Sequence, residues 1–192
     1  MSKNLDKLDR FYARNREEWH NWLQENHKSS PGIWLIYYKK SSDKPRVEYD
    51  EAVEEALSFG WIDSKVNALD EESYMQVFTP RNQGSIWSRS NKQRVNKLIQ
   101  KGQMQPAGME KVKMAKNDGS WTFLDEIEDL ILPEDLKQKL EKEKSAQKNF
   151  NNYSESVKKQ ILYWIKTAKR KETRKKRIKK TVDSALKNKI PF

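Results

Sequence analysis

The uninterrupted apolar and aromatic run Ile33-Trp34-Leu35-Ile36-Tyr37-Tyr38 constrains the fold more than any other part of the chain. Its β-branched and aromatic composition is typical of a buried strand. Residues 61–69 and 73–79 have the character of two further strands, and the acidic stretch 70–72 between them suits a hairpin turn. These segments predict a small, largely antiparallel sheet.

Helices are expected against one face of this sheet. Trp19, Trp22 and Leu23 recur at the i, i+3, i+4 spacing of one helix face and predict a helix over 14–27. Residues 50–59 predict a second helix, which ends at a glycine. This order of helices and strands indicates an α+β fold. Further helices are predicted over 91–101, 106–117 and 133–144.

The chain is long enough for one domain with an appendage or for two small domains. We expect an α+β domain over residues 1–130 and a helical region over 131–192. Within that region, Ser154 can cap a helix that forms a pair with a basic helix near the C-terminus. The stretch 141–152 is polar apart from Phe150 and is predicted to be a linker.

The positive charge of the chain is concentrated in one segment. The net charge is +11, and residues 166–189 contain twelve basic and two acidic residues, so the rest of the chain is nearly neutral. Such a helix favours nucleic acid or another polyanion, an anionic membrane or an acidic protein, or it is a solvated face without a partner. The candidate contact residues are Lys169, Arg170, Lys171, Arg174, Lys175 and Arg177.

Several classes of function are excluded by what the sequence lacks. There is no cysteine, which rules out disulfides, thiolate catalysis and cysteine-ligated metals. The sequence contains no glycine-rich phosphate loop, HExxH or GxSxG motif, so we expect no metal and no cofactor. A secretory signal and a membrane-spanning run are also missing, and we therefore expect a cytoplasmic location. Twenty aromatic residues still indicate a folded chain.

Two segments carry residues suited to a binding pocket. In the first, Trp61 and Asp63 open a strand after a helix-ending glycine, where Asp63 could act as a base, bind a cation, cap the hairpin or pair with an arginine. In the second, Arg81 follows a strand end, and its guanidinium suits a bidentate grip on a carboxylate or phosphate. Trp87 could stack on a planar ligand or anchor the loop.

The second segment continues into a predicted helix N-terminus. Ser85, Ser88 and Ser90 precede this helix, where free backbone N–H groups can receive an anion, although a plain helix cap explains the same pattern. The candidate pocket comprises Trp61, Asp63, Arg81, Ser85, Trp87, Ser88 and Asn91.

A series of motifs in order along the chain resembles the YdeI/OmpD-associated family, also called bacteriocin-protection proteins. The motifs include WHNWLQENH (19–27), YDEAVEEALSFGWID (49–63), TPRNQGSIWSRSN (79–91), AKNDGSW (115–121) and TAKRKETRKKRI (167–178), and the resemblance extends over about residues 15–185. It implies protection against antimicrobial peptides or bacteriocins and implies no reaction or cofactor. The family pattern has cysteine where this chain has Ser58.

Three functions remain open from the sequence. The first is a stress-protection protein that binds an anionic partner through residues 166–189. The second is a nucleic-acid-binding module that uses the same basic helix. The third is a small-ligand binder or enzyme that uses Asp63, Arg81, Ser85 and Trp87.

Overall fold

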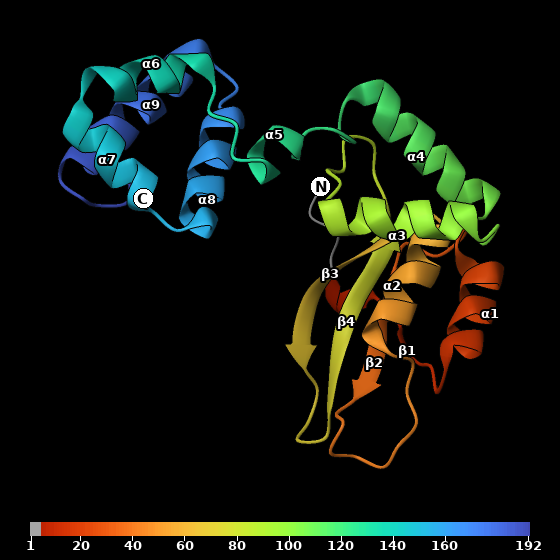
Figure 1. The fold of residues 1–192 in the computed structure, drawn as a ribbon. Helices are drawn as coiled ribbons and strands as arrows, with labels where there is room; N and C mark the ends of the chain where they lie inside the picture. The colour runs from red at the N-terminus through yellow and green to blue at the C-terminus, as the bar shows by residue number, and fades with distance from the viewer. Residues whose placement is uncertain (1–4) are drawn as a thin grey trace. The chain divides into compact units, whose positions relative to one another are not determined.

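A computed structural model of the protein describes residues 5–192, and the chain divides between Thr122 and Phe123 into two compact units (Figure 1). We call them the N-terminal unit and the C-terminal unit. The division lies before the boundary expected near residue 130, because Phe123, Leu124 and Ile127 pack into the core of the C-terminal unit.

The N-terminal unit contains a four-stranded sheet in the order β1-β2-β4-β3 (Figure 1). Strands β2 (Ile33–Tyr38), β4 (Ser73–Pro80) and β3 (Trp61–Ala68) pair antiparallel, with Ile33 opposite Phe78 and Trp61 opposite Pro80. The prediction of an α+β fold with a largely antiparallel sheet is thus confirmed. Sequence analysis missed β1 (Arg10–Tyr12), a three-residue strand parallel to β2, since it is too short to show an alternating pattern.

The apolar run that forms β2 is buried on both faces of the sheet. Leu35 and Tyr37 belong to the main core, together with residues of the helices α1 (Arg16–Asn26) and α2 (Tyr49–Ser58). Trp34 points to the opposite face, where Leu5 and Leu8 cover it and its indole N–H donates to the Leu5 carbonyl at 2.9 Å. Burial on both sides explains why this strand lacks the usual alternation of apolar and polar residues.

Two further helices complete the N-terminal unit, α3 (Arg89–Gln100) and α4 (Pro106–Asp118). The side chain of Ser88 caps α3 by accepting the Asn91 backbone N–H at 3.2 Å. Helix α4 starts at a proline and ends at Gly119, which has φ of 78°. Since a left-handed residue terminates a helix, this glycine turns the chain away immediately after Asp118.

The C-terminal unit is built entirely from helices around a separate core. Ser154 caps α8 by accepting the Val157 N–H at 3.4 Å, and α8 contacts the basic helix α9, as the sequence predicted. Phe150 and Ala146 are almost fully buried in the same core. The helices are α5 (Asp125–Glu128), α6 (Glu134–Lys142), α7 (Lys144–Asn152), α8 (Glu155–Lys166) and α9 (Lys171–Leu186).

The predicted linker over 141–152 is wrong. Most of it forms α7, which packs against α9 through Phe150, and Asn149 donates to the Ala185 carbonyl at 2.8 Å. Only Ala146 and Phe150 of this helix are buried. Because the other side chains are polar, the sequence looks like that of a connector between helices. Within residues 5–192, no helix combines the length and apolarity needed to cross a bilayer.

Candidate functional site

Arg81 is a buried arginine just beyond the end of β4. Its backbone N–H donates to the Gly60 carbonyl at 3.0 Å, which fixes the chain where α2 gives way to β3. The side chain is 2% exposed, and its guanidinium carbon lies 3.6 Å from the ring centroid of Trp87, which is itself 1% exposed. Trp121 packs against Trp87 with ring centroids 5.0 Å apart. The cation therefore rests on a fixed aromatic surface.

The guanidinium has hydrogen-bond donors that nothing in the described chain satisfies. Nη1 makes two long contacts, to Ser85 Oγ and to the Ile86 carbonyl, both at 3.4 Å. Nε and Nη2 are buried and have no hydrogen-bond partner, and Arg81 forms no ion pair with any residue from 5 to 192. A buried arginine is usually paired, because an uncompensated buried charge is costly.

Burial lowers the pKa of Arg81 to about 10, and the negative charge of Asp63 acts in the opposite direction. A guanidinium with this pKa remains protonated at neutral pH. The site therefore presents a positive charge and an open donor edge at the same time.

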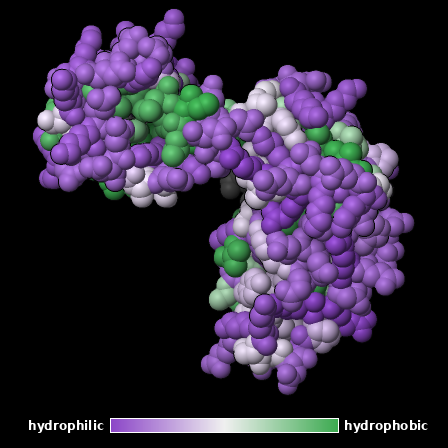
Figure 2. All heavy atoms as spheres, in the orientation of Figure 1, coloured by the Kyte–Doolittle hydropathy of each residue, from purple (hydrophilic) through white to green (hydrophobic). Residues whose placement is uncertain are grey.

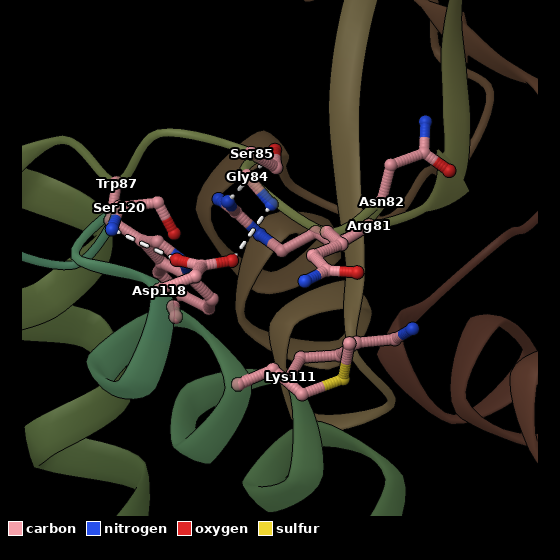
Figure 3. Close-up of a pocket in the computed structure, with 11 residues that line it drawn as sticks. Arg81, Asn82, Gly84, Ser85, Trp87, Lys111, Asp118 and Ser120 are labelled. Carbon is pink, nitrogen blue, oxygen red and sulfur yellow. Dashed lines mark hydrogen bonds between the residues drawn. The ribbon is translucent and has the colours of Figure 1, made fainter.

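Arg81 lines a small hollow at the surface of the N-terminal unit, where its guanidinium lies beside Gly84, Ser85 and Asp118 (Figure 3). The hollow and its mouth enclose about 200 Å³, with room for roughly one water molecule in the inner part. The lining residues are Arg81, Asn82, Gln83, Gly84, Ser85, Trp87, Lys111, Met114, Ala115, Asp118 and Ser120.

Asp118 supplies a carboxylate to the same hollow but does not neutralise Arg81. Its oxygens accept the backbone N–H groups of Gly84 and Ser120, both at 2.9 Å, as the dashed lines in Figure 3 show. Ser120 and then the Gly84 N–H hold the pKa of Asp118 below its usual range. The Ser120 hydroxyl is buried and contributes to this effect from nearby without a hydrogen bond of normal geometry. Asp118 thus ties the 82–85 loop to the end of α4.

Three of the seven residues proposed from the sequence meet at this hollow, namely Arg81, Ser85 and Trp87. Trp61 lies in the main core, where its indole N–H donates to the His27 carbonyl at 3.2 Å. The remaining three residues, Asp63, Ser88 and Asn91, do not line the hollow.

Asp63, Ser88 and Asn91 each have a local partner. The Asp63 carboxylate accepts from the Tyr49 hydroxyl at 3.0 Å and from the Gln76 amide at 2.8 Å. Ser88 and Asn91 form the N-terminal cap of α3, and Asn91 also accepts from Arg94 at 3.3 Å. These contacts anchor the strand β3 and the start of α3.

Sequence analysis missed the residues that α4 and its C-terminal turn contribute, above all Lys111, Asp118 and Ser120. A signal for the last two was present. An aspartate followed by glycine at the end of a predicted helix favours a turn in which the carboxylate accepts a backbone N–H two residues on. Lys111 carries no comparable signal, because an isolated lysine on a helix is normally solvated.

The basic segment divides into two groups of residues. Lys169, Arg170, Lys171 and Lys175 are exposed. Arg174 makes a bidentate ion pair with Asp135 at 2.7 and 2.8 Å, which lowers the pKa of that carboxyl. Arg177 lies over Trp164, 5.1 Å from its centroid, and donates to the Trp164 carbonyl.

The contacts of Arg174 and Arg177 give these two side chains a structural role. Arg174 also approaches the Ile165 carbonyl at 3.4 Å, so both arginines of α9 bind carbonyl groups at the C-terminal end of α8. Cations are favourable there because the last carbonyls of a helix lack intrahelical partners. In the part of the chain from Leu5 onward, no three His, Asp or Glu side chains cluster as a metal site would require.

The chain therefore combines two units. The first is an α+β unit with a mixed sheet and a buried arginine, and the second is entirely helical. Residues 11–111, more than half of the chain, match the profile of a domain of unknown function (DUF8412), and the chain therefore belongs to this family. Residues 129–188 match the family described as bacteriocin-protection, YdeI or OmpD-associated, so the C-terminal unit carries this family's domain, whereas the resemblance was expected over about residues 15–185. No significant match was found among curated proteins or solved structures.

Proposed function

We propose that the N-terminal unit is a binding module for a small oxyanion, which binds at Arg81, and that it works in the cytoplasm. The observation that carries this proposal is the buried guanidinium whose Nε and Nη2 groups have no partner in the described chain. An anion would satisfy both donors and compensate the buried charge in one step. No side chain of the hollow does either.

Binding explains this geometry better than catalysis does. The enzyme hypothesis requires Asp63 as a base beside Arg81, yet Asp63 is outside the hollow and accepts hydrogen bonds from Tyr49 and Gln76. Asp118 is inside the hollow, but backbone N–H groups hold both of its oxygens. Asp63 therefore does not reach a ligand in the hollow, and the pKa of Asp118, which is held below its usual range, makes that carboxylate a weaker base.

Saturable binding of an oxyanion to the full-length protein tests the proposal. Calorimetric titrations with formate, nitrate, phosphate and sulfate at constant ionic strength should reveal binding of at least one of them. Arg81→Gln, which removes the charge and the donor edge, should weaken that binding tenfold or more, since hydrogen bonds to charged groups contribute about 1.5–3 kcal/mol each. Arg94→Gln is the matched control, because Arg94 lies outside the hollow in the same unit and pairs with Asp50 at 2.5 Å.

The test does not depend on the variant folding. In the wild-type protein, the Arg81 Nε–H resonance should shift during the titration, and a bound anion should raise the melting temperature as its concentration exceeds the dissociation constant. If none of the four anions binds saturably to the wild-type protein, the proposal is wrong.

A second candidate function is polyanion binding by the exposed cations of α9 and the turn before it. The observation that favours it is that Lys169, Arg170, Lys171 and Lys175 are exposed while Arg174 and Arg177 are engaged within the unit. Protection against bacteriocins, after which the matched family is named, would then act through one of the two anion-binding surfaces.

Replacing Lys171, Lys175 and Lys176 with alanine should weaken binding to duplex DNA and reduce its salt dependence. The slope of log K against log salt should fall by about 0.9 for each phosphate that the variant no longer neutralises. The matched control replaces Lys137, Lys139 and Lys142 of α6, which removes the same charge from exposed positions of the same unit. Equally weakened binding in both triple variants would contradict a dedicated site on α9.

A further inference from the structure

The open edge of Arg81 has the geometry of a carboxylate receptor. In a planar guanidinium, Nε–H and Nη2–H point the same way and are spaced to meet two oxygens of one group. These are the two donors that lack partners, whereas Nη1 is turned toward Ser85 and Ile86. A ligand that uses both donors must therefore offer two oxygens side by side.

Trp87 restricts the direction of approach. Its ring covers one face of the guanidinium at 3.6 Å, so the ligand must enter near the guanidinium plane, along the free edge. The inner part of the hollow, which Arg81 lines, has room for about one water-sized group. A planar, two-oxygen group that enters the hollow and leaves the body of its ligand outside meets both conditions.

The charges of the lining select a monoanion. Arg81 and Lys111 are cations and Asp118 is an anion, so the hollow carries a net charge of one. In Figure 3 the Arg81 guanidinium and the Asp118 carboxylate point into the same space. A monoanion leaves the filled site neutral. Phosphate and sulfate carry more than one negative charge on average at neutral pH, and either would leave excess negative charge beside Asp118.

The donors of the hollow also argue against a tetrahedral anion. Phosphate sites use clusters of backbone N–H groups at a loop or helix N-terminus. Here the N–H groups of Gly84 and Ser120 already bind Asp118, and the end of α4 that reaches the hollow is its C-terminus. The donors left are the Arg81 Nε and Nη2 groups and side chains of the lining such as Asn82, Gln83 and Lys111, which do not form a cluster of backbone N–H groups.

We infer that the Arg81 hollow is a carboxylate-binding site, which takes a small monocarboxylate, or the carboxylate end of a larger molecule, bidentate on the Nε/Nη2 edge. The inference rests on the proposed oxyanion site and specifies its ligand class. In this site, Asp118 makes binding selective for monoanions, because its negative charge repels anions with more than one negative charge more strongly than it repels a carboxylate.

A competition between anions of defined shape and charge tests this inference on the full-length protein. Formate, acetate and nitrate are planar monoanions around the binding oxygens, phosphate and sulfate are tetrahedral with higher charge, and chloride is a single atom. We expect formate, acetate and nitrate to bind at least tenfold more tightly than phosphate, sulfate and chloride, with the Arg81 Nε–H resonance following each titration. Asp118→Asn should reduce the preference for formate over phosphate about fivefold or more.

Each outcome has a distinct meaning. If phosphate or sulfate binds most tightly, the oxyanion site stands and the carboxylate inference is wrong. If chloride matches formate, the site holds a single-atom anion and both ideas fail. Unchanged selectivity in Asp118→Asn, verified as folded by circular dichroism, would overturn the role of Asp118. Acetate and benzoate binding as tightly as formate would support the carboxylate end of a larger molecule as the ligand, and weaker binding of benzoate alone would support a small monocarboxylate.

Discussion

Gly108→Ala should destabilise the N-terminal unit by about 3 kcal/mol or more, although alanine is the better helix former. A Cβ at this position in α4 would lie 2.2 Å from the Ser58 carbonyl oxygen and 2.7 Å from that of Leu57. Both oxygens belong to the last turn of α2, and backbone atoms cannot move aside as a flexible side chain can. The glycine therefore lets α4 approach the end of α2, where the Gln105 N–H donates to the Ser58 carbonyl at 3.2 Å.

Urea unfolding followed by tryptophan fluorescence measures the effect of the Gly108 substitution. Gly102→Ala is the matched control, because nothing lies within 4 Å of the added Cβ and only its φ of 66° opposes the change. A left-handed alanine costs about 1 kcal/mol, so the control should remain well folded. If the two variants lose equal stability, α4 does not pack on α2 as closely as the structure shows. Lys111 and Asp118 belong to α4, so this outcome would also contradict their positions in the lining of the Arg81 hollow.

Phe150→Ala should destabilise the C-terminal unit by about 3–5 kcal/mol, the usual loss when a buried phenylalanine is truncated. Phe150 is 2% exposed and contacts Tyr153, with ring centroids 5.7 Å apart. Its neighbour Asn151 is exposed, and Asn151→Ala should change stability by no more than about 0.5 kcal/mol.

Amide hydrogen exchange localises the effect of the Phe150 substitution. Protection of α8 and α9 should fall in Phe150→Ala and remain in Asn151→Ala, because α7 packs against α9. A linker would tolerate both changes equally, so equal protection in the two variants would restore the interpretation of 141–152 as a connector.

The elements that sequence analysis identified correctly have strong local patterns. The β2 run, the cap at Ser154 and the Trp19 and Leu23 stripe of α1 are each encoded within a few neighbouring residues. The missed elements lack such patterns. Strand β1 has three residues, and α7 has only two buried side chains. Packing against distant parts of the chain, and not propensity, makes these segments regular.

The candidate site was predictable to the extent that it lies in one segment. Arg81, Ser85 and Trp87 fall within seven residues, and the chemistry of each was visible in the sequence. Asp63 and Trp61 looked equally suited to a pocket, yet the register of β3 against β4 places Asp63 opposite Phe78 and next to Gln76 and Tyr49. The type of a residue was therefore not enough to predict whether its side chain lines the hollow.

By itself, the sequence determined the α+β class, most of the helices and strands, and the position of the excess charge. These properties follow from periodicity, capping and composition, which act over short distances along the chain. Only the tertiary structure decided that Arg81 is buried without a carboxylate partner among residues 5–192. It also decided that Arg174 and Arg177 stabilise the C-terminal unit while Lys175 stays exposed. Whether a charge is paired depends on groups brought close by folding, because electrostatic and hydrogen-bond energies fall with distance in space and not along the sequence.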